Sequence, residues 1–276
     1  MTAGIVLDMP EAEYHSRPEL SSTQARLLLQ SPARYQHALT HPKPARTVFD
    51  VGTAAHTKIL GVGSGTIAYP PEHLTPSGNV STKAATVEWA AAQRANGLTP
   101  VTPQQVSEVD AMAEAVLAHP TARVLLEQPG APEASVFATE AETGVDLRSR
   151  FDFLPEPGPR PIAVDVKSAA DASPREFARA AANHGYHVQE GHYEDTVEDL
   201  IDLAGFVFLV VEKDPPHLVG VYQLEPEFRA AGRAAAARAR RVLAECRERG
   251  EWPGYPTEVQ LLATPYWLIA ELETPA

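Results

Sequence analysis

The chain is poor in cysteine and in long apolar runs. Its 276 residues include a single cysteine, Cys246, which excludes a disulfide framework and any four-cysteine zinc or iron–sulfur site built by this chain alone. No run of 18 apolar residues occurs, and the N-terminus lacks a basic region followed by an apolar one. The sequence therefore predicts a soluble, cytoplasmic protein with no membrane segment.

Positive charge is also scarce, with 23 Lys and Arg against 36 Asp and Glu and a net charge of −13. Phosphate binding needs clustered cations, so this composition argues against general affinity for nucleic acid. A local basic groove or binding through metal ions remains open. Hydrophobic residues make up 44%, which is enough for a sizeable core. Neither repeats nor a linker divide the chain, and we expect one domain over residues 1–276.

The stretch from Leu147 to Ser168 carries the most informative chemistry. It reads LRSRFDFLPEPGPRPIAVDVKS, two β-type runs that flank a Pro/Gly turn. Side chains alternate along a strand, so Asp165 and Lys167 share one face and lie roughly 7 Å apart along it. The other face of this run is apolar and consists of Ile162, Val164 and Val166. We expect the apolar face to pack into a core and the polar face to carry the chemistry.

If the turn forms a hairpin, Asp152 lies opposite Asp165. Two neighbouring carboxylates favour Mg²⁺, or Mn²⁺ in its place, because these ions prefer oxygen ligands. A lysine beside such an ion can orient an attacking water or help to deprotonate it. The pattern resembles the D…(D/E)-x-K signature of the PD-(D/E)xK nuclease superfamily. Taken alone, it also fits a solvated hairpin face that bears two acids and a lysine.

Two further segments resemble one branch of this superfamily. The string YHSRPELSSTQARLLLQSPARY predicts two serine-capped helices and resembles the N-terminal segment of phage-type exonucleases of the exonuclease VIII (RecE-like) branch, relatives of lambda exonuclease. The run from Phe49 to Leu60 predicts a helix with one apolar stripe beside His56. A lone histidine there is typically a partly buried structural residue. The pattern G-(S/T)-A-x-H-x-x-(I/V)-L resembles the histidine motif of the branch and implies that His56 reaches the metal site.

The middle of the chain predicts a loop over 61–80, helices near 82–96, 102–118 and 121–127, and a strand over 133–139. With 147–154 and 162–168 this strand forms a predicted antiparallel meander, which the apolar runs 205–212 and 218–224 extend. Glu133 resembles the glutamate that opens this strand in the branch; otherwise it is a plain exposed residue. Arg148 and Arg150 share a parity with Asp152, which fits either a solvated face or phosphate binding. Ser168, next to the lysine, joins them as a DNA-binding candidate.

The C-terminal third contains a capping box at Ser173 and Glu176, which predicts a helix ending near Gly185. The following string GYHVQ-x-x-x-Y places Gln189 and Tyr193 on one helix face. It resembles the motif that follows the catalytic lysine and implies that both side chains approach the scissile phosphate and a bound water. A long Ala/Arg helix over 226–249 is either an exposed helix or a DNA-backbone contact. The tail, 252–267, resembles the terminal segment of the branch, and we expect it to pack against the body.

The resemblance implies an α/β fold: a mixed central sheet flanked by helices, with a helical N-terminal segment. It implies a metal-dependent exodeoxyribonuclease that degrades linear double-stranded DNA, 5′ to 3′, in phage-type recombination. Asp152, Asp165 and the carbonyl of Val166 would hold Mg²⁺ with His56 and Glu133, and Lys167 would position the water. A different endonuclease of the superfamily and a non-catalytic DNA-binding protein remain alternatives. The implied partners are DNA ends, further copies of the chain in a closed ring, and a phage single-strand annealing protein.

Overall fold

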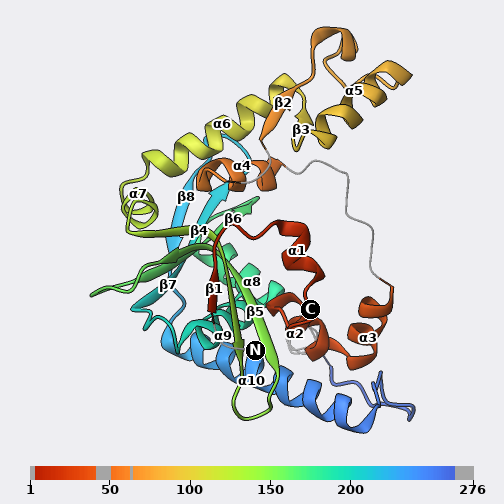
Figure 1. Ribbon diagram of the computed structural model, residues 1–276, viewed down its shortest axis with the longest axis vertical. Helices are drawn as coiled ribbons and strands as arrows, with labels where there is room; N and C mark the ends of the chain where they lie inside the picture. Colours follow the sequence, from red (N-terminus) through yellow and green to blue (C-terminus); the bar gives the residue numbers. More distant parts are fainter. Residues whose placement is uncertain (1–3, 42–50, 63–64, 265–276) are drawn as a thin grey trace, which may run out of the picture.

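The computed structural model describes residues 4–41, 51–62 and 65–264. Its centre is a six-stranded sheet with helices on both faces (Figure 1), in the order β1-β4-β5-β6-β7-β8. The strands are β1 (Gly4–Val6), β4 (Gly130–Thr139), β5 (Asp146–Pro155), β6 (Ile162–Ala169), β7 (Gly205–Glu212) and β8 (Val219–Tyr222). Neighbouring strands are antiparallel except β6 and β7, which are parallel. The predicted mixed α/β fold is confirmed.

The predicted meander corresponds to β4, β5 and β6, and both later apolar runs join the same sheet. Parallel neighbours need a crossover, and the helices α8 (Pro174–His184) and α9 (Tyr186–Val197) supply it between β6 and β7. The sequence pattern did not predict β1, which pairs with β4 at one edge of the sheet.

Two hydrophobic layers enclose the sheet. On one face, Phe151, Phe206 and Phe208 pack with Tyr193 of α9 and with α8, and α10 (Pro226–Arg249) lies against α9. On the other face, Val164 and Val166 pack with α4 (Val51–Leu60), α6 (Pro103–Ala118) and α7 (Pro120–Leu126). The apolar face predicted for β6 is therefore buried, and the α9 helix covers its opposite face.

The N-terminal helices are α1 (Glu11–Ser16), α2 (Ser22–Gln30) and α3 (Pro32–Thr40). Ser21 caps α2 as predicted, together with Gln24 in a capping box. The capping box predicted at Ser173 is wrong, because α8 has no side-chain cap bond. The Ser173 N–H donates to Asp171 Oδ1 at 2.7 Å, and Glu176 pairs with Arg179 at 2.9 Å instead of reaching back.

The segment predicted as a loop over 61–80 contains regular structure. Its strand β2 (Thr66–Ala68) pairs in parallel with β3 (Thr99–Val101), and a 3-10 helix (Pro71–His73) and α5 (Ala84–Ala95) lie between them. Figure 1 shows this unit projecting beyond α4 and α6. Tyr69 and His73 pack their rings on Trp89, at centroid distances of 5.0 and 5.2 Å. These aromatic contacts join residues far apart in the chain, so local pattern does not reveal them.

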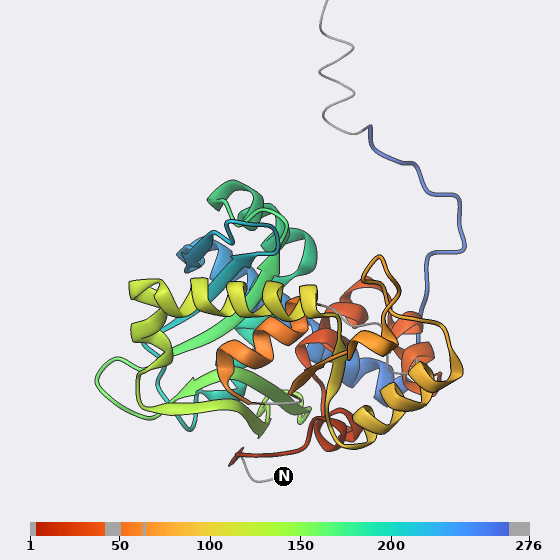
Figure 2. The same cartoon turned by 90° about the horizontal axis from the view of Figure 1, so that it is seen from above.

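After α10 the chain contacts α3 and then leaves the body (Figure 2). Trp252 stacks on Tyr35 at 5.6 Å, and Arg34 Nη2 donates to the Tyr255 hydroxyl at 2.9 Å. Val259 and Leu261 are 100% exposed, so the prediction that the tail packs against the body is wrong there. Residues 49–50 of the predicted α4 segment and 265–267 of the tail lie outside the described residues. Within the described part of the chain, no helix combines the length and apolarity needed to cross a membrane.

Candidate metal and catalytic site

The backbone departs from regular strand geometry where the acidic residues meet. The pairs Pro132↔Phe153 and Ala134↔Phe151 put Glu133 opposite Asp152. Glu133 has φ +51°, in the left-handed region that non-glycine residues seldom adopt. Phe151 and Phe153 are two apart and should share a face, yet they belong to clusters on opposite sides of the sheet. The side-chain alternation of β5 therefore shifts at Asp152.

The strands β5 and β6 separate at the same place. Their one regular pair, Phe153↔Val164, puts Asp152 opposite Asp165 by continuation of the register. Beyond it, the Val166 N–H donates to Asp152 Oδ2 at 2.7 Å. A side-chain carboxylate thus takes the place of a backbone acceptor and links the two strands directly.

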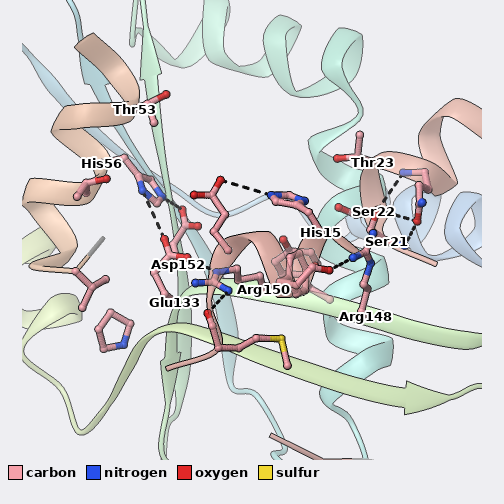
Figure 3. A pocket seen from close by; sticks show the side chains of 18 of the residues that line it. His15, Ser21, Ser22, Thr23, Thr53, His56, Glu133, Arg148, Arg150 and Asp152 are labelled. Carbon is pink, nitrogen blue, oxygen red and sulfur yellow. Dashed lines mark hydrogen bonds and ion pairs between the residues drawn. The ribbon is translucent and has the colours of Figure 1, made fainter. Parts of the chain in front are cut away.

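Three of the predicted metal ligands converge (Figure 3). His56 Nε2 lies 2.8 Å from Asp152 Oδ2, and His56 Nδ1 lies 3.8 Å from Glu133 Oε1. One ligand atom from each of these residues lies within 4.8 Å of the others. All three side chains are partly exposed. One imidazole and two carboxylates are donors that a divalent cation can take, so the donor set fits such an ion. Asp165 is not among the three.

Asp165 forms a second group with the predicted catalytic residues. It is 1% exposed, Gln189 Nε2 donates to its Oδ1 at 2.5 Å, and Lys167 Nζ lies 2.5 Å from its Oδ2. The ammonium also lies 4.9 Å from the ring centre of Tyr186, a cation–π contact that the sequence reading missed. The predicted shared face of Asp165 and Lys167 is thus an ion pair, held by α9.

The titratable groups of the site perturb one another. Burial alone would lower the pKa of His56, but the carboxylates of Asp152, Glu133 and Asp165 outweigh it and raise this pKa to about 9. Burial raises the pKa of Asp165 to about 6, an effect that Lys167 opposes and Asp152 reinforces. Burial would also raise the pKa of Asp152, but His56 and Lys167 lower it. His56 is therefore protonated at neutral pH and must release a proton before it ligates a cation.

One pocket contains His56 and Asp152 of the first group and Asp165, Lys167 and Gln189 of the second, and Val166, Ser168 and Tyr193 lie in its wall with them. Tyr193 is buried, with its ring 4.8 Å from that of Phe151. The reading of the sequence missed Thr23 and Arg26 of α2, which line the same pocket. Arg26 Nη2 donates to Thr23 Oγ1 at 3.1 Å, and Nη1 donates to the His184 carbonyl at 2.6 Å. Their spacing of three residues places both on one helix face, a signal that the helix pattern contained.

The arginines singled out for DNA are already engaged within the protein. Arg148 is buried and donates to the Tyr14 carbonyl, and Arg150 donates to Glu133 and to the Met9 carbonyl. The N-terminal segment packs on both guanidinium groups, and both residues line the larger groove of this region. Their predicted contact with DNA stays a prediction. On α10, Arg229 and Arg240 pair with Glu194 and Asp195 of α9, at 2.5 and 2.7 Å.

Residues 21–265 match the family described as "PDDEXK-like domain of unknown function (DUF3799)". The chain belongs to this family. The fold of this PDDEXK-like protein is similar to a crystal structure described as a "Putative exonuclease" from Eubacterium rectale, with a TM-score of 0.59, 10% sequence identity, and coverage of 97% of this chain and 99% of that chain. At this identity the likeness shows the fold alone. No curated protein matches the sequence. The superfamily prediction is confirmed, and the narrower exonuclease VIII branch stays a prediction.

Proposed function

We propose that this PDDEXK-like protein is a metal-dependent exodeoxyribonuclease that degrades linear double-stranded DNA from its 5′ ends. The observation that carries the proposal is one pocket in which His56 and Asp152, two members of the three-residue cluster with Glu133, lie beside the Asp165–Lys167 pair. Membership of a nuclease-like family supports phosphodiester hydrolysis. Degradation from ends, its 5′ to 3′ direction and a place in phage-type recombination extend the sequence resemblance and belong to the proposal.

The proposed chemistry assigns each group a task. His56, Glu133 and Asp152 would hold Mg²⁺ or Mn²⁺, with Asp165 and the Val166 carbonyl as further oxygen donors. When bound, the cation lowers the pKa of a water and neutralises charge on the phosphate. Lys167 holds its ammonium 2.5 Å from Asp165, where it orients the attacking water.

Three polar side chains on the helices around this pocket support the same reaction. Gln189 keeps Asp165 in place through its 2.5 Å hydrogen bond. Burial raises the pKa of Tyr193 well above its usual value, so this residue stays a neutral hydroxyl donor toward phosphate or water. Arg26 supplies a guanidinium in the wall of the pocket, where it is suited to bind a phosphate oxygen.

Because the chain is acidic, the proposed nuclease needs a feature that retains the DNA duplex during digestion. The pocket continues into a larger groove, which shares His56 and Asp152 with it and has Arg34, His37 and Arg94 in its walls. At a net charge of −13, such a groove supplies little counterion release. We therefore propose a closed cyclic homo-oligomer, a tetramer in preference to a trimer, that encloses the duplex. A phage single-strand annealing protein is the proposed recipient of the product strand.

The first test compares linear duplex DNA with a covalently closed circle, with and without Mg²⁺, on a denaturing gel. We expect progressive loss of the linear DNA only when Mg²⁺ is present, and no cleavage of the circle. Cleavage of the circle would indicate an endonuclease instead. Binding without any cleavage would indicate a non-catalytic DNA-binding protein. Lys167→Ala serves as the control for contaminating nucleases.

The second test concerns assembly. Light scattering measures the mass in solution, and a trap of excess competitor DNA, added during digestion, measures release. A ring predicts a mass of several subunits and digestion that continues after the trap is added. A monomer whose digestion stops at once would refute the ring while leaving the nuclease chemistry intact.

A further inference from the structure

Two arginines of β5 hold the N-terminal segment of residues 4–16 against the sheet. The ring of Tyr14 lies against both guanidinium groups, 4.8 Å from Arg148 and 5.5 Å from Arg150. Arg148 donates to the Tyr14 carbonyl, and Arg150 Nη1 donates to the Met9 carbonyl at 2.9 Å. Met9 and Tyr14 are both buried and pack with Phe137. The segment is thus fixed by two similar side chains, two residues apart.

The two arginines differ in their contacts beyond the N-terminal segment. Arg150 Nε donates to Glu133 Oε2 and its Nη1 donates to Ser135 Oγ at 3.5 Å, whereas the guanidinium of Arg148 contacts Tyr14 of the N-terminal segment. The other oxygen of Glu133 faces His56 Nδ1 at 3.8 Å. Figure 3 shows Arg150 directly beside Glu133, on the side away from His56. Arg150 is therefore connected to the metal cluster through one carboxylate, and Arg148 is not.

Glu133 needs such a contact because of its backbone. At φ +51° it occupies a conformation that persists only when its surroundings hold it. A glutamate side chain has several rotatable bonds, and a charge-assisted hydrogen bond to a guanidinium removes most of that freedom. The planar fork of Arg150 binds Glu133 with one nitrogen and Met9 with another. A lysine ammonium keeps the charge but does not reproduce this geometry.

We propose that Arg150 is a positioning residue for the metal site: it fixes Glu133 toward His56, and the N-terminal segment in turn fixes Arg150. Folding of residues 4–16 onto β5 is thereby coupled to metal affinity. This inference rests on the proposed function only in taking the His56, Glu133 and Asp152 cluster as a cation site. It assigns to Arg150 a role in addition to the predicted DNA contact, which stays a prediction.

The test measures Mn²⁺ affinity by calorimetry on the full chain, with thermal unfolding in chelator as a separate reading of stability. Arg150→Lys retains the positive charge, so its effect reports geometry. We expect it to weaken Mn²⁺ binding about tenfold, the lower end of what loss of a ligand-orienting partner costs. Arg148→Lys is the matched control: it should lower the thermal midpoint and weaken Mn²⁺ binding less than Arg150→Lys does, because Arg148 contacts the N-terminal segment but not Glu133. Equal losses of affinity in both variants, or none in Arg150→Lys, would overturn the proposal.

A double-mutant cycle tests whether Arg150 acts through Glu133. We expect Glu133→Gln to weaken Mn²⁺ binding and Arg150→Lys to add nothing further in that background. Additive losses would overturn the proposal. Tyr14→Leu removes the ring that supports both guanidinium groups, and a severalfold loss of affinity is expected; an unchanged affinity would overturn the part assigned to the N-terminal segment. The readout is metal binding, so a failure to cleave DNA would refute the proposed function and leave this inference standing.

Discussion

We predict that Gly232→Ala destabilises the protein, although alanine is the better helix former. Gly232 is buried in α10, where a methyl group would overlap the carbonyl oxygen of His187 on α9. On the other helix, a methyl group at Gly191 would lie 2.7 Å from the backbone nitrogen of Arg233. The two helices therefore cross with their backbones in contact, and two glycines permit that approach.

Two opposing effects decide how much Gly232→Ala changes the free energy of unfolding. Alanine in place of glycine favours a helix interior by about 1 kcal/mol. Overpacking a filled interface costs about 1–3 kcal/mol, occasionally more. At Gly232 the obstructing atoms belong to the backbone of His187, so no side-chain rotation relieves the overlap and the upper part of that range applies. We expect a net loss of about 1–2 kcal/mol, which lowers the thermal midpoint by about 2–4 °C per kcal/mol in a domain approaching this size.

Thermal unfolding in chelator, followed by circular dichroism, measures this effect. Ala234→Gly is the matched control, because Ala234 lies in the same helix and is exposed, so it reports helix propensity alone. Gly232→Ala should also reduce DNA cleavage, because displacement of α9 moves Gln189 away from Asp165. A thermal midpoint that rises with Gly232→Ala by as much as it falls with Ala234→Gly would show that propensity dominates, and would refute the close crossing.

Three further predictions concern the site itself. Lys167→Ala should abolish cleavage of linear DNA and leave the circular dichroism spectrum unchanged, because the ammonium points into the pocket; near wild-type turnover would remove Lys167 from the mechanism. Asp165→Asn should weaken Mg²⁺ and Mn²⁺ binding about tenfold or more, because an amide supplies no charge; an unchanged calorimetric affinity would exclude Asp165 as a ligand. The raised pKa of His56, about 9, means that a bound cation displaces a proton, so Mn²⁺ affinity should rise between pH 7 and 9 and proton release should appear in buffers of different ionisation enthalpy. His56→Ala should bind Mn²⁺ more weakly and lose this dependence. Without metal, the raised pKa of His56 has the opposite effect, because it stabilises the folded protein at low pH. This contribution to the free energy of unfolding is complete below the usual pKa of 6.5 and is lost as pH rises through about 9.

The sequence by itself determined most of the long elements and much of the candidate site. A period of two along 162–168 was sufficient to separate the buried Val164 and Val166 from Asp165 and Lys167, because strand geometry imposes that alternation. The four-residue spacing of Gln189 and Tyr193 placed both side chains in the same pocket, because helix geometry repeats at that interval. Such rules act within one element, and they hold wherever the element forms.

The contacts between elements were decided by the tertiary structure alone. The pattern of β5 places Arg148 and Arg150 on the same face. The Arg148 guanidinium donates to the Tyr14 carbonyl, whereas the Arg150 guanidinium donates to Glu133. The phase shift at Asp152 and the left-handed backbone of Glu133 follow from how β4, β5 and α4 meet. Distances across elements depend on packing among residues far apart in sequence, and a charged side chain takes whichever partner that packing brings within reach. For this reason the candidate ligands His56, Glu133 and Asp152 could be named from the sequence, and the groups that hold them in place could not.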